Sequence, residues 1–136
     1  MNEIALFAND GRVMCDRCRV ADSFGSRFFG LMGKATLPRG EGLLFPRTSS
    51  VHTHFMRFPI DVVFRDADGR VLSIVRNLRP WRFARCRGAA DVLELPGGES
   101  DRVGLGVGTL IVDDPADGLN PSTRSGAPRR RRGPED

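Results

Sequence analysis

The sequence predicts an α+β domain that is rich in β-strands and contains one short helix. Three observations support this prediction: the apolar segments are short, turn-forming residues separate them, and one longer segment repeats its apolar residues at helical spacing. The 136 residues, 40% hydrophobic and 28% charged, suit one globular domain. We therefore expect a single domain over residues 1–113.

The N-terminal part is expected to form a β-hairpin followed by the helix. Residues 4–7 predict a first strand, the Asn-Asp-Gly turn at 9–11 tolerates positive φ, and residues 17–21 continue the hairpin. The helix is expected over residues 24–32, where four apolar side chains share one face: Phe24, Phe28, Leu31 and Met32. Gly33 is placed to end it.

The rest of the domain is expected to consist mainly of strands. Residues 60–65 and 71–75 predict a hairpin, because both are apolar and an Asp-Ala-Asp-Gly turn joins them. Residues 51–56 predict another strand. Because side chains alternate between the two faces of a strand, His52 and His54 are expected on the same face. The remaining expectations are strands at 43–45, 91–95 and 109–112, a loop at 76–88 and one helical turn at 99–103.

The C-terminal residues 114–136 have a different composition from the rest of the chain. They hold one large apolar residue, Leu119, so we expect a disordered basic tail. Without the five arginines and four acids of this tail, the formal charge falls only from +4 to +3. Few cysteines, no secretory apolar segment and no membrane-spanning stretch lead us to expect a cytoplasmic protein.

A family resemblance rests on the order and spacing of four stretches. They are Gly30-Leu31-Met32-Gly33, Gly40-Glu41-Gly42-Leu43-Leu44-Phe45, His52 through Phe64, and Val92-Leu93-Glu94-Leu95-Pro96-Gly97-Gly98. Over roughly residues 20–112, this pattern resembles the family called domain of unknown function 192. The resemblance implies a curled antiparallel sheet that approaches a small barrel. It implies no reaction, because no biochemical function is established for that family.

One departure from the family pattern limits what the resemblance implies. Many members carry Trp-Met-Lys-Asn-Thr where this chain reads Phe55-Met56-Arg57-Phe58. A polar role of the Asn-Thr pair is therefore not expected in this chain.

Candidate ligand-binding residues gather around two arginines and the single tryptophan. An arginine offers a planar fork to a carboxylate or phosphate, and a tryptophan offers a flat stacking surface. We expect a binding or accessory module for a small anionic ligand or a protein partner, with this rim: His52, Arg57, Asp61, Trp81, Arg82 and Glu94. The alternative interpretation is structural, with Arg57–Asp61 and Arg82–Glu94 as ion pairs and His52 as a hydrogen-bonded residue.

A zinc site is the alternative function, although no cofactor is expected. Cys15-x-x-Cys18 has the spacing of a zinc half-site, and His52-x-His54 puts two imidazoles on one strand face. Four such ligands would complete a tetrahedral site. Neighbouring arginines at 12, 17 and 19 oppose it, and the competing interpretation is two reduced thiols with two unrelated histidines.

Other functions have less support in the sequence. Residues 76–87 hold five arginines with Trp81 and Phe83, a mixture that can bind single-stranded nucleic acid. The domain charge of only +3 argues against nucleic acid, so we do not expect it as a partner. No nucleophile elbow, carboxylate pair or phosphate-binding loop is recognisable, so enzyme activity stays open; a small hydrolase with His52 as base is the weaker alternative.

Overall fold

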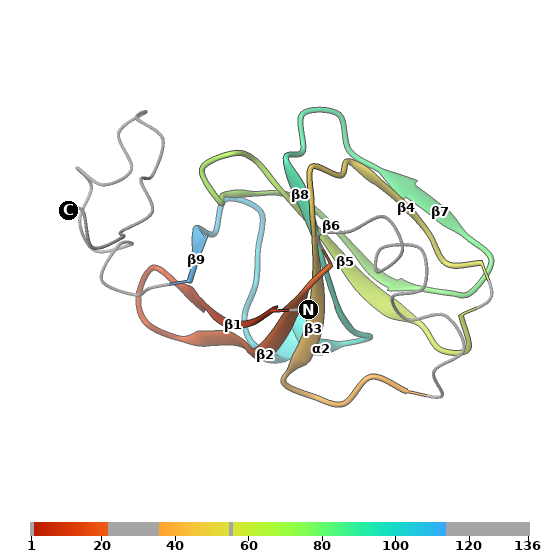
Figure 1. Ribbon diagram of the computed structural model, residues 1–136, viewed down its shortest axis with the longest axis horizontal. Helices are drawn as coiled ribbons and strands as arrows, with labels where there is room; N and C mark the ends of the chain where they lie inside the picture. Colours follow the sequence, from red (N-terminus) through yellow and green to blue (C-terminus); the bar gives the residue numbers. More distant parts are fainter. Residues whose placement is uncertain (1, 22–35, 55, 114–136) are drawn as a thin grey trace.

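The computed structural model describes residues 2–21, 36–54 and 56–113 and shows a curled seven-stranded sheet with a smaller two-stranded sheet beside it (Figure 1). The large sheet has the strand order β6-β5-β8-β3-β2-β1-β9. Its strands are β1 (Asn2–Ala8), β2 (Val13–Val20), β3 (Glu41–Pro46), β5 (Ile60–Arg65), β6 (Val71–Leu78), β8 (Asp91–Pro96) and β9 (Ile111–Val112). The small sheet pairs β4 (Ser50–His52) with β7 (Phe83–Arg85), and α2 (Glu99–Arg102) follows β8.

The two edges of the large sheet meet next to β9. Leu110 bridges Arg70 at the start of β6, and the amide of Val71 donates to the carbonyl of Thr109 at 2.8 Å. This contact gives the sheet the barrel-like curl that the family resemblance implied. One strand pair differs from the expected antiparallel sheet, because β2 and β3 run parallel. Residues 21–40 supply the long connection that a parallel pair needs.

Two hydrophobic clusters lie on opposite faces of the central strands. Leu93 and Val63 belong to the cluster on the concave side, while Val92 and Val62 belong to the second cluster. Strands β5 and β8 are therefore buried on both faces, which explains why their sequences read as nearly continuous apolar runs. The second cluster includes Val51 from β4 and Ala84 from β7, so the small sheet covers this outer face.

Local sequence patterns were the most reliable guides to these elements. The hairpin predicted at 60–65 and 71–75 is confirmed as β5 and β6, and the turn predicted at 99–103 is confirmed as α2. The loop predicted at 76–88 is wrong in part, because β6 continues to Leu78 and β7 lies within that range. The helix predicted at 24–32 and the tail at 114–136 lie outside the described residues.

The strand predicted at 51–56 is shorter in the structure, where β4 ends at His52. The chain turns after Thr53, where the amide of Met56 donates to the Thr53 carbonyl at 3.2 Å, so the strand does not continue. Within the described residues, no helix is long and apolar enough to cross a membrane.

Candidate functional site

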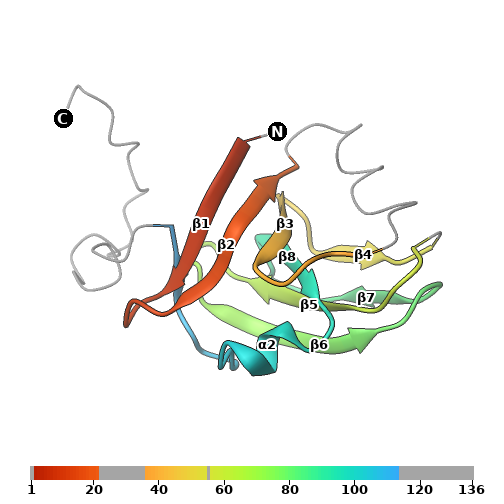
Figure 2. The ribbon, with the colours of Figure 1, turned by 90° about the horizontal axis from the view of Figure 1, so that it is seen from below.

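The two-stranded sheet of β4 and β7, called the ribbon below, presents one face to the core and the other to solvent. Val51 pairs with Ala84, and both side chains are buried in the second cluster. Because side chains alternate along a strand, the neighbouring pair of His52 and Phe83 faces outward. Phe83 is 58% exposed, an unusual position for a phenylalanine. Figures 1 and 2 place the ribbon at one end of the molecule, away from β1 and β9.

Thr53 fixes the turn that leads into the ribbon. This fully buried residue donates its hydroxyl to the Arg79 carbonyl at 2.6 Å and accepts the Arg82 amide at 2.9 Å. Its carbonyl accepts the Trp81 amide at 3.0 Å. These bonds hold Trp81 at a φ of 66°, a conformation that costs energy for a bulky residue. No role was expected for Thr53 from the sequence, where the one signal was its place on the opposite strand face from His52 and His54.

Aromatic rings continue from the ribbon onto this turn. The rings of His52 and His54 lie 4.9 Å apart, and those of His54 and Trp81 lie 5.1 Å apart, both edge to face. Trp81 is 54% exposed. The Nδ1 atom of His54 is buried and has no hydrogen-bond partner in the part of the chain that the structure describes. The result is a row of three rings at one end of the molecule, in which His52 and Trp81 are exposed and His54 is partly buried between them.

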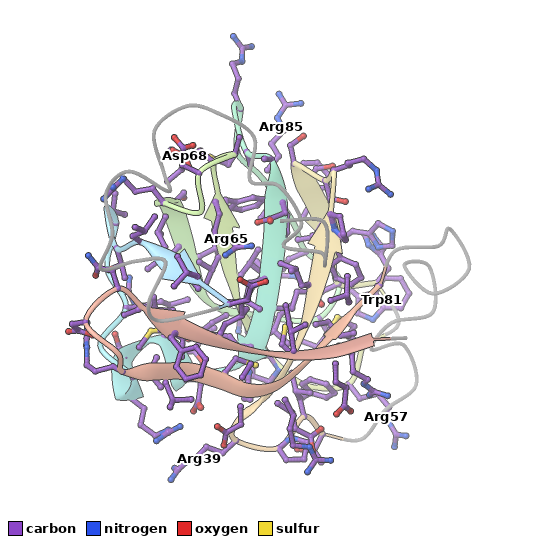
Figure 3. All side chains as sticks on the ribbon, turned by 60° about the vertical axis from the view of Figure 1, so that its left-hand side comes forward. Arg39, Arg57, Arg65, Asp68, Trp81 and Arg85 are labelled. Carbon is purple, nitrogen blue, oxygen red and sulfur yellow. The ribbon has the colours of Figure 1, made fainter. Side chains whose placement is uncertain are left out.

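Positive charge is concentrated on the segments that carry the ribbon, residues 46–60 and 76–90, called the basic segments below. They hold seven arginines and no acid, while the rest of residues 1–113 holds nine basic and thirteen acidic residues, a net charge of −4. Arg76 pairs with Asp101 across 3.0 Å. The other arginines of the basic segments are exposed: Arg47, Arg57, Arg79, Arg82, Arg85 and Arg87. Figure 3 shows Arg57 and Trp81 on the same side of the molecule, with Arg65 inside the sheet.

Asp61 belongs to the structural part of the domain and not to this surface. It is fully buried on β5, where one carboxylate oxygen accepts the amides of Asn77 and Gly98 at 2.9 and 3.1 Å. The other oxygen accepts the amide and hydroxyl of Ser100 at 2.8 and 2.6 Å. Asp61 therefore ties β6 and α2 to β5.

Glu94 is also buried, but in apolar surroundings. On β8 it faces the same side as Val92, and its partners across the sheet are Leu43 and Val62. It is 4% exposed, and burial raises the pKa of its carboxyl to about 8. Glu94 is thus protonated at neutral pH in the folded protein and is not placed to pair with the exposed Arg82. Neither of the ion pairs considered in the sequence analysis occurs among those between described residues.

The four residues of the zinc alternative lie in two separate places. A bulge in β2 lets Cys15 and Cys18 both face the concave core, where they oppose Leu6 and Ile4. A hydrogen bond with the Cys15 thiol, together with burial, raises the pKa of Cys18. His52 and His54 lie on the ribbon side instead. Across residues 2–21, 36–54 and 56–113, no group of three or more metal-ligating side chains is assembled.

Fold and surface together define a class of protein: a small β-rich domain whose curled sheet carries a basic, aromatic ribbon on its outer face. The family follows from comparison with known sequences. The model of the DUF192 family, described as an uncharacterized ACR, matches residues 5–112. The chain belongs to this family, as the four stretches of the sequence indicated.

Individual relatives agree with this assignment. The chain is 34% identical over 106 residues to a UPF0127 protein from Thermococcus sibiricus, covering 74% of this chain and 68% of that one. A solved structure of a protein of unknown function from Novosphingobium aromaticivorans is similar with a TM-score of 0.70 and 25% identity, over 81% and 83% of the two chains. The solved structure of a putative transcription regulator from Sinorhizobium meliloti is similar with a TM-score of 0.71 and 25% identity. The match covers 81% of this chain and 91% of that one.

Proposed function

We propose that this protein is a binding module that holds an anionic ligand against the ribbon. The observation that carries the proposal is the separation of charge: seven arginines and no acid lie on the basic segments, and the rest of residues 1–113 has a net charge of −4. The positive charge of the basic segments attracts anions, even though the net charge of the whole chain is small. Of the rim expected from the sequence, His52, Arg57, Trp81 and Arg82 contribute to this surface.

The geometry favours binding over a purely structural role for Arg82. Arginines that stabilise this fold have close partners, as Arg65 does with Asp91 at 2.7 Å. Among the described residues, the guanidinium of Arg82 contacts only the carbonyls of its own loop, those of Pro80 and Trp81, at 3.5 Å. A guanidinium with such long contacts keeps most of its hydrogen-bonding capacity for an incoming carboxylate or phosphate.

The single tryptophan makes this proposal directly testable. Trp81 is the only tryptophan in the chain, so tryptophan fluorescence reports on the turn beside the ribbon. Titration of the full chain with inorganic tripolyphosphate at low salt should change this emission. Arg82→Ala should weaken binding by about 10-fold, because a charge-assisted hydrogen bond is worth about 1.5–3 kcal/mol. The melting temperature should stay unchanged.

The matched control is Arg17→Ala on β2, whose side chain is 65% exposed outside the basic segments. It removes the same charge and should leave tripolyphosphate binding within about twofold of wild type. If both variants lost the same tripolyphosphate affinity, the anion would be attracted by the net charge alone and not by the ribbon. A lower melting temperature of Arg82→Ala without loss of binding would show a structural role and contradict the proposal.

A further inference from the structure

The outward face of the ribbon arranges its rings in successive pairs. His52 lies across from Phe83, and the next pair outward along the two segments is His54 with Trp81. The rings of His52 and His54, one from each pair, lie 4.9 Å apart, so the two pairs are direct neighbours on this surface. Trp81 and Phe83 are 54% and 58% exposed, so a ligand that covers both must spread over an open surface. Small ligands are normally enclosed in clefts instead.

We propose that the ligand of the ribbon is single-stranded nucleic acid, an inference that rests on the proposed function and specifies its ligand. Unpaired bases would stack on Trp81 and Phe83, while the flanking Arg82 and Arg85 would contact phosphates. Exposed aromatic faces combined with a positive groove or surface are what sequence-tolerant single-strand binders use, since every base has a π-face. Bases of a duplex are already stacked and cannot use these rings.

The small net charge of the domain no longer argues against this ligand. The charge is unevenly distributed, because the thirteen acids of residues 1–113 all lie outside the basic segments. Six exposed arginines around the ribbon provide several phosphate contacts: Arg47, Arg57, Arg79, Arg82, Arg85 and Arg87. An acidic peptide would satisfy these arginines and leave the exposed rings unused. The rings therefore favour nucleic acid over an acidic protein.

The test compares an oligothymidylate of twelve nucleotides, dT12, with tripolyphosphate on the full chain, again by Trp81 fluorescence. We expect dT12 to bind at least 10-fold more tightly than tripolyphosphate and more tightly than a duplex of the same length. Phe83→Leu keeps the apolar bulk and removes the ring, so it should weaken dT12 by about 5-fold or more and leave tripolyphosphate unaffected. Phe83→Tyr keeps an aromatic ring and leaves Trp81 as the only tryptophan, so it should bind dT12 as wild type does.

Further variants separate the ribbon from other basic parts of the chain. Arg82→Ala with Arg85→Ala should reduce the slope of log affinity against log salt by about 1.4, because each phosphate contact contributes about 0.7 for a single strand. Replacing Arg129–Arg132 with serine should leave the dT12-dependent change in Trp81 emission intact. Loss of that change in the serine variant would assign binding to the tail and overturn the inference.

Each remaining outcome decides between the two proposals. Equal affinity for tripolyphosphate and dT12, with no effect of Phe83→Leu, would leave an anion site and refute nucleic acid as its ligand. Stronger binding of poly-glutamate, or of vesicles rich in phosphatidylserine, would refute it in favour of an acidic protein or a membrane. No change in Trp81 emission with any of these probes would refute the proposed function as well.

Discussion

The α2 end of the molecule and the ribbon use polar residues in opposite ways. Under α2, the carboxylate of Asp61 is buried and accepts four hydrogen bonds from three residues. On the ribbon and the adjoining turn, Arg82 and the rings of Trp81 and Phe83 are exposed, and hydrogen bonds of the Thr53 backbone and hydroxyl hold this turn. Polar groups that stabilise this fold are therefore enclosed with their partners, whereas polar groups suited to binding face outward from a rigid support. Substitutions at the two ends should have separable effects on stability and on binding.

The largest effect is expected from Asp61→Ala. The substitution leaves the amides of Asn77, Gly98 and Ser100 without their acceptor, and each buried unsatisfied donor costs about 1–3 kcal/mol. We expect a loss of about 4–5 kcal/mol in the free energy of unfolding, measured by urea denaturation. If this variant does not fold, Asp61→Asn, which keeps one acceptor oxygen, should fold with a smaller loss. A loss below about 1 kcal/mol for alanine would contradict the structural role of Asp61.

Arg65→Ala tests the other buried polar contact of the sheet. Arg65 makes two hydrogen bonds with Asp91, at 2.8 and 2.7 Å, and donates to the Ile111 carbonyl at 2.9 Å. Removing one member of such a pair leaves a partly buried charge without compensation and costs about 3–5 kcal/mol. Arg85→Ala is the matched control, because this arginine is exposed on the ribbon and should change stability by less than about 0.5 kcal/mol. Similar losses of stability in both variants would contradict the distinction between enclosed arginines that stabilise the fold and exposed arginines that do not.

The buried carboxyl of Glu94 should make the stability of the protein depend on pH. Its folded-state pKa of about 8 is raised above the usual 4.5 by burial, so the folded chain keeps a proton that the unfolded chain releases. Stability should be greatest below about pH 5, fall by at most about 1.4 kcal/mol per pH unit as the pH rises toward 8, and then level off. Glu94→Gln should flatten the curve of melting temperature against pH over this window. A curve of unchanged shape in the glutamine variant would exclude Glu94 as its cause.

The elements predicted correctly from the sequence are those whose signals are local. The β5–β6 hairpin has its turn and both apolar strands within residues 60–78, so a short window contains the whole pattern. β7 was missed because it has only three residues and pairs with β4, about thirty positions earlier in the sequence. Its arginine-rich composition is typical of a loop, and only the tertiary pairing makes it a strand.

In the candidate site, too, the sequence indicated which residue types could bind a ligand but not which side chains are exposed. Grouping His52, Trp81 and Arg82 was possible because their types suggest binding, and the structure places all three on the ribbon side. Asp61 and Glu94 are acidic residues that the sequence placed on an exposed rim, yet both are buried. Whether a carboxylate is enclosed depends on the strands beside it, and the sequence does not give that arrangement.

Thr53 links the two ends of the comparison, because it is a buried polar residue that supports the exposed surface. Thr53→Val keeps the shape of the side chain but removes the hydroxyl that contacts Arg79 and Arg82. We expect a loss of about 1–2 kcal/mol in stability, the smallest of these effects, because the backbone bonds of residue 53 remain. The emission of Trp81 should be quenched more strongly by iodide, since its turn is held less firmly. Thr53→Ser keeps the hydroxyl and should behave as wild type; equal iodide quenching in the valine variant and wild type would show that the backbone bonds alone hold Trp81.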